Sequence, residues 1–230
     1  MKPLLTVLLP VFNERNTFLA VLHAVRAVPI EKEILILDDA SSDGTRDLLL
    51  TTVDGVYPDV RVYYHASNLG KGAALRTLIP YARGTYCIVQ DGDMEYDPQD
   101  YLSMIAAFEN KKASVVYGSR FIHGMPPMRP ANRLVNILLA WMVRVLFGAS
   151  ITDEATCYKA FDTELLQSIP LTCRRFEFCP EVTAKVLRRG YNIAEVPVSY
   201  SARTFAEGKK IRWTDGVEAI WTLIKFRFVK

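Results

Sequence analysis

The sequence predicts an α/β fold in which helices flank a mainly parallel β-sheet. Short apolar runs, typical of buried strands, alternate along the chain with segments whose apolar residues recur at helical spacing. Polar clusters follow the apolar runs, as expected where a parallel sheet binds a ligand beyond the carboxyl ends of its strands. With 230 residues, half of them hydrophobic and 23% charged, the chain can form one large domain with a buried core.

The elements are expected in regular alternation along the chain. Apolar runs predict strands at residues 4–9, 33–37, 60–64, 86–89, 114–117 and 193–200. Helical spacing, as in Phe18, Leu22 and Val25, predicts helices at residues 17–28, 46–53, 73–81, 98–110, 133–148, 177–189 and 213–228. Residues 153–161 mix polar and aromatic side chains and are expected to form a loop.

Three acidic residues crowd together just past the fourth predicted strand. Asp91, Asp93 and Glu95 repel one another, and a hard divalent cation with oxygen ligands would offset that repulsion. An acidic surface turn is the alternative. A calcium loop fits less well, because its sixth and twelfth positions require glycine and glutamate, where this chain has Tyr96 and Leu102.

Two more polar clusters follow strands. Asp38 and Asp39 could hydrogen-bond a ribose or a base, whereas residues 43–45 could simply cap the next helix. Residues 68–72, which include Lys71, do not match a Walker motif or a dinucleotide-binding fingerprint. A flexible turn into a helix is the simplest interpretation of that segment.

Basic side chains gather in the second half of the chain. The arginines and lysines with donors suited to phosphate are Arg120, Arg129, Arg133, Arg203, Lys209 and Lys210. Downstream of the acidic cluster, they suggest two anionic groups held in one cleft. The net charge of +3 is too small to predict a nucleic-acid partner.

Cysteine usage and hydropathy bound the location of the protein. The four cysteines show no Cys-x-x-Cys spacing, which predicts a reduced, cytoplasmic protein. No uninterrupted apolar run reaches the roughly 18 residues of a membrane span, so we expect a soluble or peripheral protein. The amphipathic helices at 133–148 and 213–228 mix aromatic and basic residues, which suits a membrane interface but also a protein core or a partner helix.

A series of motifs resembles a known family. In order along the chain they are LPVFNE (9–14), LDDASSDGT (37–45), NLGKG (68–72) and QDGD (90–93). Together they resemble family-2 glycosyltransferases of the GT-A fold, over nearly the whole chain. The segments 117–121 and 203–210 are similar to the dolichol-phosphate mannose synthase branch and its polyprenyl-phosphate relatives. Many relatives show Ser-Gly-Phe after an aspartate, where this chain has DEATCYK (153–159).

The resemblance implies roles for individual residues. The nucleotide-binding residues would be Pro10, Phe12, Glu14, Asp39, Lys71 and Asp91. Asp91 and Asp93 would bind the diphosphate through Mg²⁺ or Mn²⁺, with Glu95 as a third ligand. The acceptor phosphate would be bound by Arg120, Arg133, Arg203 and Lys209. The catalytic residues would be Asp93, Arg120, Arg133 and Asp153.

The resemblance also implies a reaction. Residues 1–120 would bind a nucleotide diphosphate sugar of the GDP-mannose or UDP-glucose type, and residues 121–230 a polyprenyl phosphate at the cytoplasmic face of a membrane. The acceptor phosphate is already ionised, so single displacement with inversion would need no general base. A soluble enzyme acting on a hydroxyl is the alternative, with Asp153 or Glu154 as its base. The printed sequence ends at Lys230 without the transmembrane pair of several relatives, so a membrane anchor subunit is a possible partner.

Overall fold

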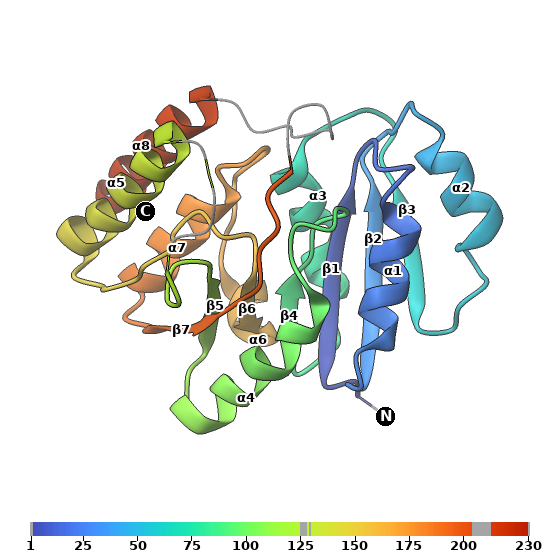
Figure 1. The fold of residues 1–230 in the computed structure, drawn as a ribbon, viewed down its shortest axis with the longest axis horizontal. Helices are drawn as coiled ribbons and strands as arrows, with labels where there is room; N and C mark the ends of the chain where they lie inside the picture. Colours follow the sequence, from blue (N-terminus) through green and yellow to red (C-terminus); the bar gives the residue numbers. More distant parts are fainter. Residues whose placement is uncertain (1, 125–127, 129, 204–212, 230) are drawn as a thin grey trace.

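The computed structural model describes residues 2–124, 128, 130–203 and 213–229. These residues form one seven-stranded sheet in the order β3-β2-β1-β4-β6-β5-β7, with helices on both faces (Figure 1). The strands are β1 (Leu5–Val11), β2 (Lys32–Asp38), β3 (Val60–Tyr64), β4 (Tyr86–Val89), β5 (Val115–Ser119), β6 (Lys159–Asp162) and β7 (Ile193–Pro197). β6 pairs antiparallel with β4 and β5, and the other pairs are parallel. The prediction of a mainly parallel α/β sheet is confirmed.

The helices alternate with the strands, as predicted. They are α1 (Phe18–Ala27), α2 (Thr45–Thr52), α3 (Lys71–Leu78), α4 (Tyr101–Lys111), α5 (Pro130–Phe147), α6 (Thr163–Ser168), α7 (Phe178–Arg188) and α8 (Trp213–Phe228). Short 3₁₀ turns, Ile79–Tyr81 and Pro98–Asp100, follow α3 and precede α4.

Two apolar cores lie on opposite faces of the sheet. Successive side chains of a strand point to opposite faces, so Val7 and Leu9 of β1 join one core and Leu8 joins the other. The core of Val7 and Leu9 includes residues of α1, α2 and α4, and the core of Leu8 includes residues of α3, α6, α7 and α8. Because the central strands are apolar on both sides, the polar loops at the strand ends are left to form the site.

The sequence prediction was wrong about part of the segment 153–161. Its last residues, from Lys159, form strand β6, which is followed at once by helix α6. β6 begins with a lysine that is fully buried, donates to the Glu154 carbonyl over 2.7 Å and lies over the ring of Tyr117. Such a start does not resemble an apolar run. Asp162 ends the strand and caps α6, accepting from the backbone N–H groups of Glu164 and Leu165.

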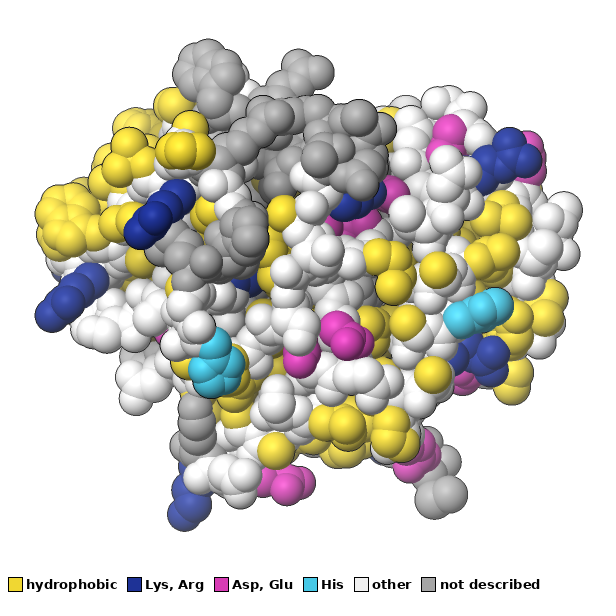
Figure 2. All heavy atoms as spheres, viewed as in Figure 1, with side chains coloured by type: hydrophobic (Ala, Val, Ile, Leu, Met, Phe, Trp, Pro, Cys, Tyr) yellow, Lys and Arg dark blue, Asp and Glu magenta, His cyan; other side chains and the backbone are white. Residues whose placement is uncertain are grey.

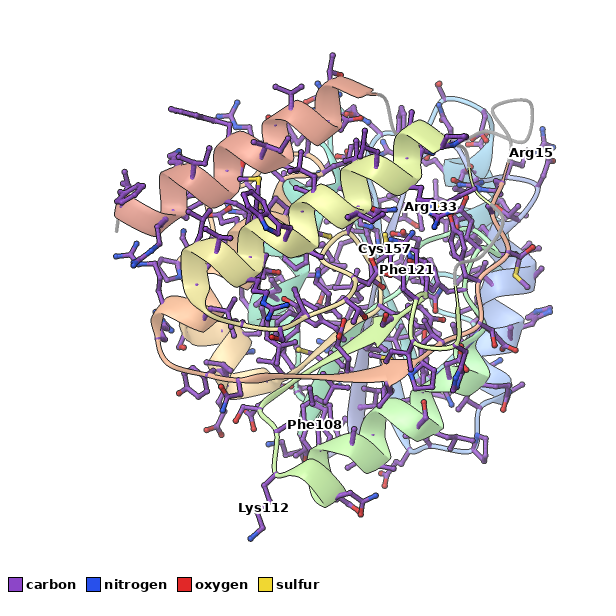
Figure 3. All side chains as sticks on the ribbon, turned by 60° about the vertical axis from the view of Figure 1, so that its left-hand side comes forward. Arg15, Phe108, Lys112, Phe121, Arg133 and Cys157 are labelled. Carbon is purple, nitrogen blue, oxygen red and sulfur yellow. The ribbon has the colours of Figure 1, made fainter. Side chains whose placement is uncertain are left out.

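α5 and α8 lie side by side outside α7 (Figures 1 and 3). Among the described helices, α5 alone is long and apolar enough to cross a membrane, with 18 residues and a mean hydropathy of 1.2. The sequence predicts no uninterrupted apolar run of this length, because Asn132, Asn136 and Arg144 interrupt the segment. A single helix of this kind is weak support for a membrane crossing, and only 17% of its length is buried.

Candidate active site

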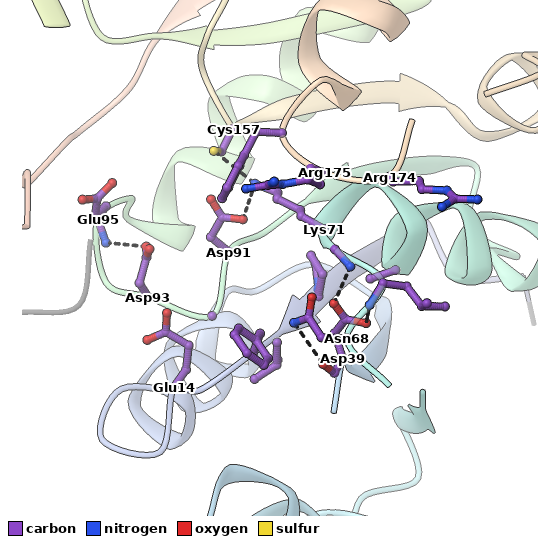
Figure 4. A pocket seen from close by; sticks show the side chains of 18 of the residues that line it. Glu14, Asp39, Asn68, Lys71, Asp91, Asp93, Glu95, Cys157, Arg174 and Arg175 are labelled. Atoms are coloured by element: carbon purple, nitrogen blue, oxygen red, sulfur yellow. Dashed lines mark hydrogen bonds and ion pairs between the residues drawn. The ribbon is translucent and has the colours of Figure 1, made fainter. Parts of the chain in front are cut away.

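A cavity of about 530 Å³ lies beyond the carboxyl ends of β1, β2 and β4. Its lining includes every residue predicted to bind the nucleotide or the metal, together with Arg203: Pro10, Phe12, Glu14, Asp39, Lys71, Asp91, Asp93, Glu95 and Arg203. Figure 4 shows Glu14, Asp93 and Glu95 at one end, Asp39 and Asn68 at the other, and Lys71 with Asp91 between them. The structure therefore brings together residues that lie far apart in the sequence.

The acidic end of the cavity surrounds the guanidinium of Arg203. Its Nη1 lies 3.1 Å from Glu14 Oε2, and its Nη2 contacts the carboxylate of Asp93. The backbone N–H of Arg203 donates to Glu95 over 2.9 Å. Burial, and then the charge of Asp91, raises the pKa of Asp93 to about 7, although Arg203 pulls it the other way. The carboxylates here are thus crowded enough to require positive charge.

The middle of the cavity contains a buried ion pair. Lys71 Nζ lies 2.5 Å from Asp91 Oδ1 and donates to Cys157 Sγ over 3.2 Å. Burial alone would lower the pKa of the Lys71 ammonium, but the charge and hydrogen bond of Asp91, together with Cys157 and Cys179, outweigh burial and raise that pKa well above its usual value. Lys71 therefore stays charged beside any anion that enters the cavity.

At the far end, Asp39 holds the loop that begins at Asn68. Its carboxylate accepts from the backbone N–H groups of Leu69, over 2.9 Å, and Gly70, over 2.7 Å. Asp38, its neighbour in sequence, does not line the cavity: it is fully buried and accepts from Arg46 Nε over 2.6 Å. Of the two aspartates that could have met a ribose, only Asp39 is placed to do so.

The residues 43–45 act as a local cap. Asp43 Oδ1 accepts from the backbone N–H and hydroxyl of Thr45, and Asp43 Oδ2 accepts from the backbone N–H of Arg15. These bonds start α2 and fasten it to the turn after β1. The capping interpretation fits this geometry.

Sequence reasoning missed one wall of the cavity, which Arg174, Arg175 and Phe176 form before α7. Their loop docks on the start of α3, where the backbone N–H of Gly72 donates to the Arg175 carbonyl over 3.0 Å. A Cβ at Gly70, which has a φ of +92°, would lie 2.4 Å from the Arg174 carbonyl oxygen. The glycines of the 68–72 segment thus permit close approach of this loop. They were the available signal for it.

The predicted acceptor residues are placed differently from one another. Arg120 is bound by Asp153 through two bonds of 2.7 Å, and neither residue lines the cavity. Arg133 is exposed near the start of α5 (Figure 3), and Lys209 lies outside the described residues. Tyr200 connects the two regions: its hydroxyl donates to Glu95 over 3.2 Å, and the Arg120 guanidinium lies over its ring.

The carboxylates fit a hard divalent cation in chemistry. Asp91, Asp93 and Glu95 offer the oxygen ligands that Mg²⁺ and Mn²⁺ prefer, and burial, followed by the charges of Asp91 and Glu95, raises the pKa of Asp93. Within the described part of the chain, however, no three acidic, histidine or cysteine side chains are arranged as around a metal ion. Instead, Lys71 forms an ion pair with Asp91, and Arg203 forms one with Asp93.

Residues 6–169 match the family Glycosyl transferase family 2. Among characterised proteins, the chain is 27% identical to an undecaprenyl-phosphate mannosyltransferase from Micrococcus luteus, covering 88% of this chain and 85% of the relative. It is 29% identical to a polyprenol monophosphomannose synthase from Mycolicibacterium smegmatis, covering 88% and 79%. A dolichyl-phosphate hexose transferase from Haloferax volcanii is 28% identical, with 86% and 83% covered.

Solved structures show the same fold. Glucosyl-3-phosphoglycerate synthase from Mycobacterium tuberculosis, crystallised with Mn²⁺ and UDP, superposes with a TM-score of 0.74 at 19% identity, over 99% of this chain and 81% of that one. A mannosyltransferase from Pyrobaculum calidifontis, crystallised with GDP-Man and Mn²⁺, gives 0.62 at 16% identity, over 98% and 73%. The motifs, the sheet and the match over residues 6–169 agree: the chain belongs to glycosyl transferase family 2 and is a glycosyltransferase.

Proposed function

We propose that this enzyme moves a hexose from a nucleotide diphosphate sugar to a polyprenyl phosphate, with inversion at the anomeric carbon and with a divalent cation. The observation that carries the proposal is the cavity beyond β1, β2 and β4, which holds the predicted nucleotide and metal residues together. The names of the relatives, which act on undecaprenyl, polyprenol or dolichyl phosphates, support this acceptor class.

The donor would lie along the length of the cavity. Asp39 and the loop it holds face the nucleoside, with Pro10 and Phe12 in the same lining. Lys71 meets the diphosphate, which needs charge stabilisation as it leaves. Asp91, Asp93 and Glu95 would hold Mg²⁺ or Mn²⁺, which would supply Lewis-acid stabilisation of the leaving diphosphate. The donor would thus contact mainly residues 1–120, with Cys157, residues 174–176 and Arg203 completing the cavity.

A phosphate acceptor suits the state of Asp153 better than a hydroxyl acceptor does. A hydroxyl needs a general base with an available carboxylate oxygen near the sugar. Asp153 is fully buried outside the cavity lining, and Arg120 binds both of its oxygens. Glu154 is also buried. A lipid phosphate is already ionised, so the enzyme needs to position it rather than deprotonate it. Asp153 then serves to hold Arg120 in place through two hydrogen bonds.

A polyprenyl phosphate acceptor lies in a membrane. An exposed apolar surface on α5 and α8 is suited to contact with that membrane. Trp141 on α5 is 58% exposed, and Trp221 and Phe228 on α8 are 63% and 76% exposed. Exposed Arg144 and Lys225 lie on the same two helices. Figure 2 shows hydrophobic side chains with basic ones beside them over this side of the molecule. We propose that these two helices rest in the interface of an anionic membrane at its cytoplasmic face. A separate anchor subunit is not required for this contact.

The test is release of nucleoside diphosphate from GDP-mannose, UDP-glucose and UDP-N-acetylglucosamine, with Mn²⁺ and with or without a polyprenyl phosphate. We expect one donor to turn over only with the lipid phosphate, and Asp93→Asn to reduce the rate at least about a hundredfold. Turnover indifferent to the lipid would instead indicate the soluble, hydroxyl-dependent enzyme. An α-linked product from an α-linked donor would rule out single displacement.

A further inference from the structure

Three carboxylates from two loops converge on one side chain, that of Arg203. Glu14 follows β1, Asp93 and Glu95 follow β4, and Arg203 follows β7. Its side chain is 15% exposed, so the ion pairs form largely out of water. Asp93 and Glu95 also belong to the cluster to which the proposed function assigns a divalent cation.

We propose that the guanidinium of Arg203 takes the place of the divalent cation in the metal-free protein, and that cation binding displaces it. The inference rests on the proposed function only for the presence of a cation at this cluster. It concerns an exchange between two positive groups, which the transfer reaction does not itself require.

The guanidinium and a cation at this cluster would compete for the carboxylates of Asp93 and Glu95. Nη1 of Arg203 is 3.1 Å from Glu14 Oε2, an oxygen that also accepts from Thr17 over 2.8 Å. Nη2 is bound to Asp93 Oδ2. A carboxylate oxygen directed at a guanidinium N–H cannot coordinate a metal with the same lone pair, and two cations at that distance repel strongly. The guanidinium and the cation therefore compete for Asp93 Oδ2.

The surrounding chain allows the exchange. The backbone of the segment is fixed independently of the guanidinium, because Ser201 donates its N–H to the Glu95 carbonyl over 2.8 Å and Tyr200 reaches the Glu95 side chain. Arg203 can thus move its side chain without moving its anchor. Without a cation, removing the guanidinium would leave crowded carboxylates uncompensated, which explains why it lies there. Once displaced, the guanidinium can meet an anionic group in the same cavity.

The exchange can be measured through the affinity for the cation. By thermodynamic linkage, the Arg203 ion pairs lower the cation affinity by the same factor by which the bound cation weakens those ion pairs. We would titrate Mn²⁺ into the full chain without nucleotide or lipid, following free Mn²⁺ by electron paramagnetic resonance. Arg203→Gln should bind Mn²⁺ about tenfold more tightly than wild type or better, since charge-assisted bonds no longer oppose it. Arg203→Lys should fall between the two. Arg174→Gln, at the other end of the cavity (Figure 4), should leave the affinity unchanged.

Equal or weaker Mn²⁺ binding by Arg203→Gln and Arg203→Lys, with both variants folded by circular dichroism, would overturn the proposal. So would a gain that persists when Asp93→Asn is added, because the competition would then lie elsewhere. Because no donor or acceptor is present, this result is separate from the transferase assay. A chain that binds Mn²⁺ as described but transfers no sugar would refute the proposed function alone.

Discussion

Glu181 on α7 organises the cavity wall that precedes this helix. Its carboxylate is fully buried and accepts from the backbone N–H of Thr172 over 2.8 Å and that of Cys173 over 2.7 Å. Lys185, one turn along, lies 2.5 Å away. Burial would raise the pKa of Glu181, but the hydrogen bonds from Lys185 and Thr172 outweigh it and hold the pKa below its usual value. The ionised carboxylate therefore stabilises the folded protein.

The substitution Glu181→Gln keeps the shape but removes the charge. An amide NH₂ replaces Oε2 and cannot accept from Cys173, and Lys185 loses the negative charge of its buried partner. Breaking a buried pair from one side costs about 3–5 kcal/mol, and we expect the lower end because the amide oxygen still accepts from Thr172. Glu177→Gln is the control. Glu177 is half-buried and accepts only backbone N–H groups among the bonds described, so about 1 kcal/mol is expected.

The assay is urea unfolding of wild type and Glu181→Gln at pH 7 and at pH 4. A depressed folded pKa adds stability above the unfolded value of 4.5, and this is lost as pH falls through the folded value. The gap in unfolding free energy should thus be full at pH 7 and shrink as the pH falls below about 4.5. A gap below about 1 kcal/mol at pH 7, or one that does not shrink in acid, would refute the reasoning.

Two further outcomes are expected. Gly70→Ala should destabilise the protein by about 2 kcal/mol or more, because the left-handed backbone and the Arg174 carbonyl both oppose a Cβ. Gly55→Ala is the control: with a φ of +74° and nothing within 4 Å of the added Cβ, it should destabilise the protein by only about 1 kcal/mol. Chemical unfolding of both variants would compare them. The double variant Trp141→Ser, Trp221→Ser should bind anionic vesicles at least about tenfold more weakly in flotation with an unchanged melting temperature, and equal flotation would exclude this face as the membrane contact.

The strands and helices that the sequence predicted were those with strong local signals. Runs such as that of β1 are apolar except at Thr6, because the strand is covered on both faces. β6 gave no such signal: it has four residues and begins with Lys159. That buried lysine is stabilised by its hydrogen bond to the Glu154 carbonyl and by its contact with the Tyr117 ring, and these contacts depend on the tertiary fold. Local pattern cannot reveal a strand whose first residue is satisfied by distant partners.

The candidate site, like the fold, was predicted where local motifs mark it and not where it depends on tertiary contacts. Motifs after β1, β2 and β4 pointed to the residues of the cavity, because the carboxyl ends of parallel strands meet at one edge. What the motifs could not show is pairing. Arg120 meets Asp153, and Arg203 meets Asp93, across long stretches of chain. The sequence also did not predict the wall at Arg174, because backbone groups make its contacts with α3, and backbone groups are the same in every residue.

The antiparallel strand β6 has a consequence for synthesis on the ribosome. The half-sheet β3-β2-β1-β4 is complete once Val89 has emerged, but β4 then has an open edge. Its partner, Lys159–Asp162, arrives only after α4, β5 and α5, several seconds later at about 5–20 residues per second. During that interval the nascent chain presents an unpaired strand to its neighbours. A chain stalled before Lys159 should therefore tend to self-associate. Pairing of β6 with β4 covers the open edge of β4 and removes this tendency.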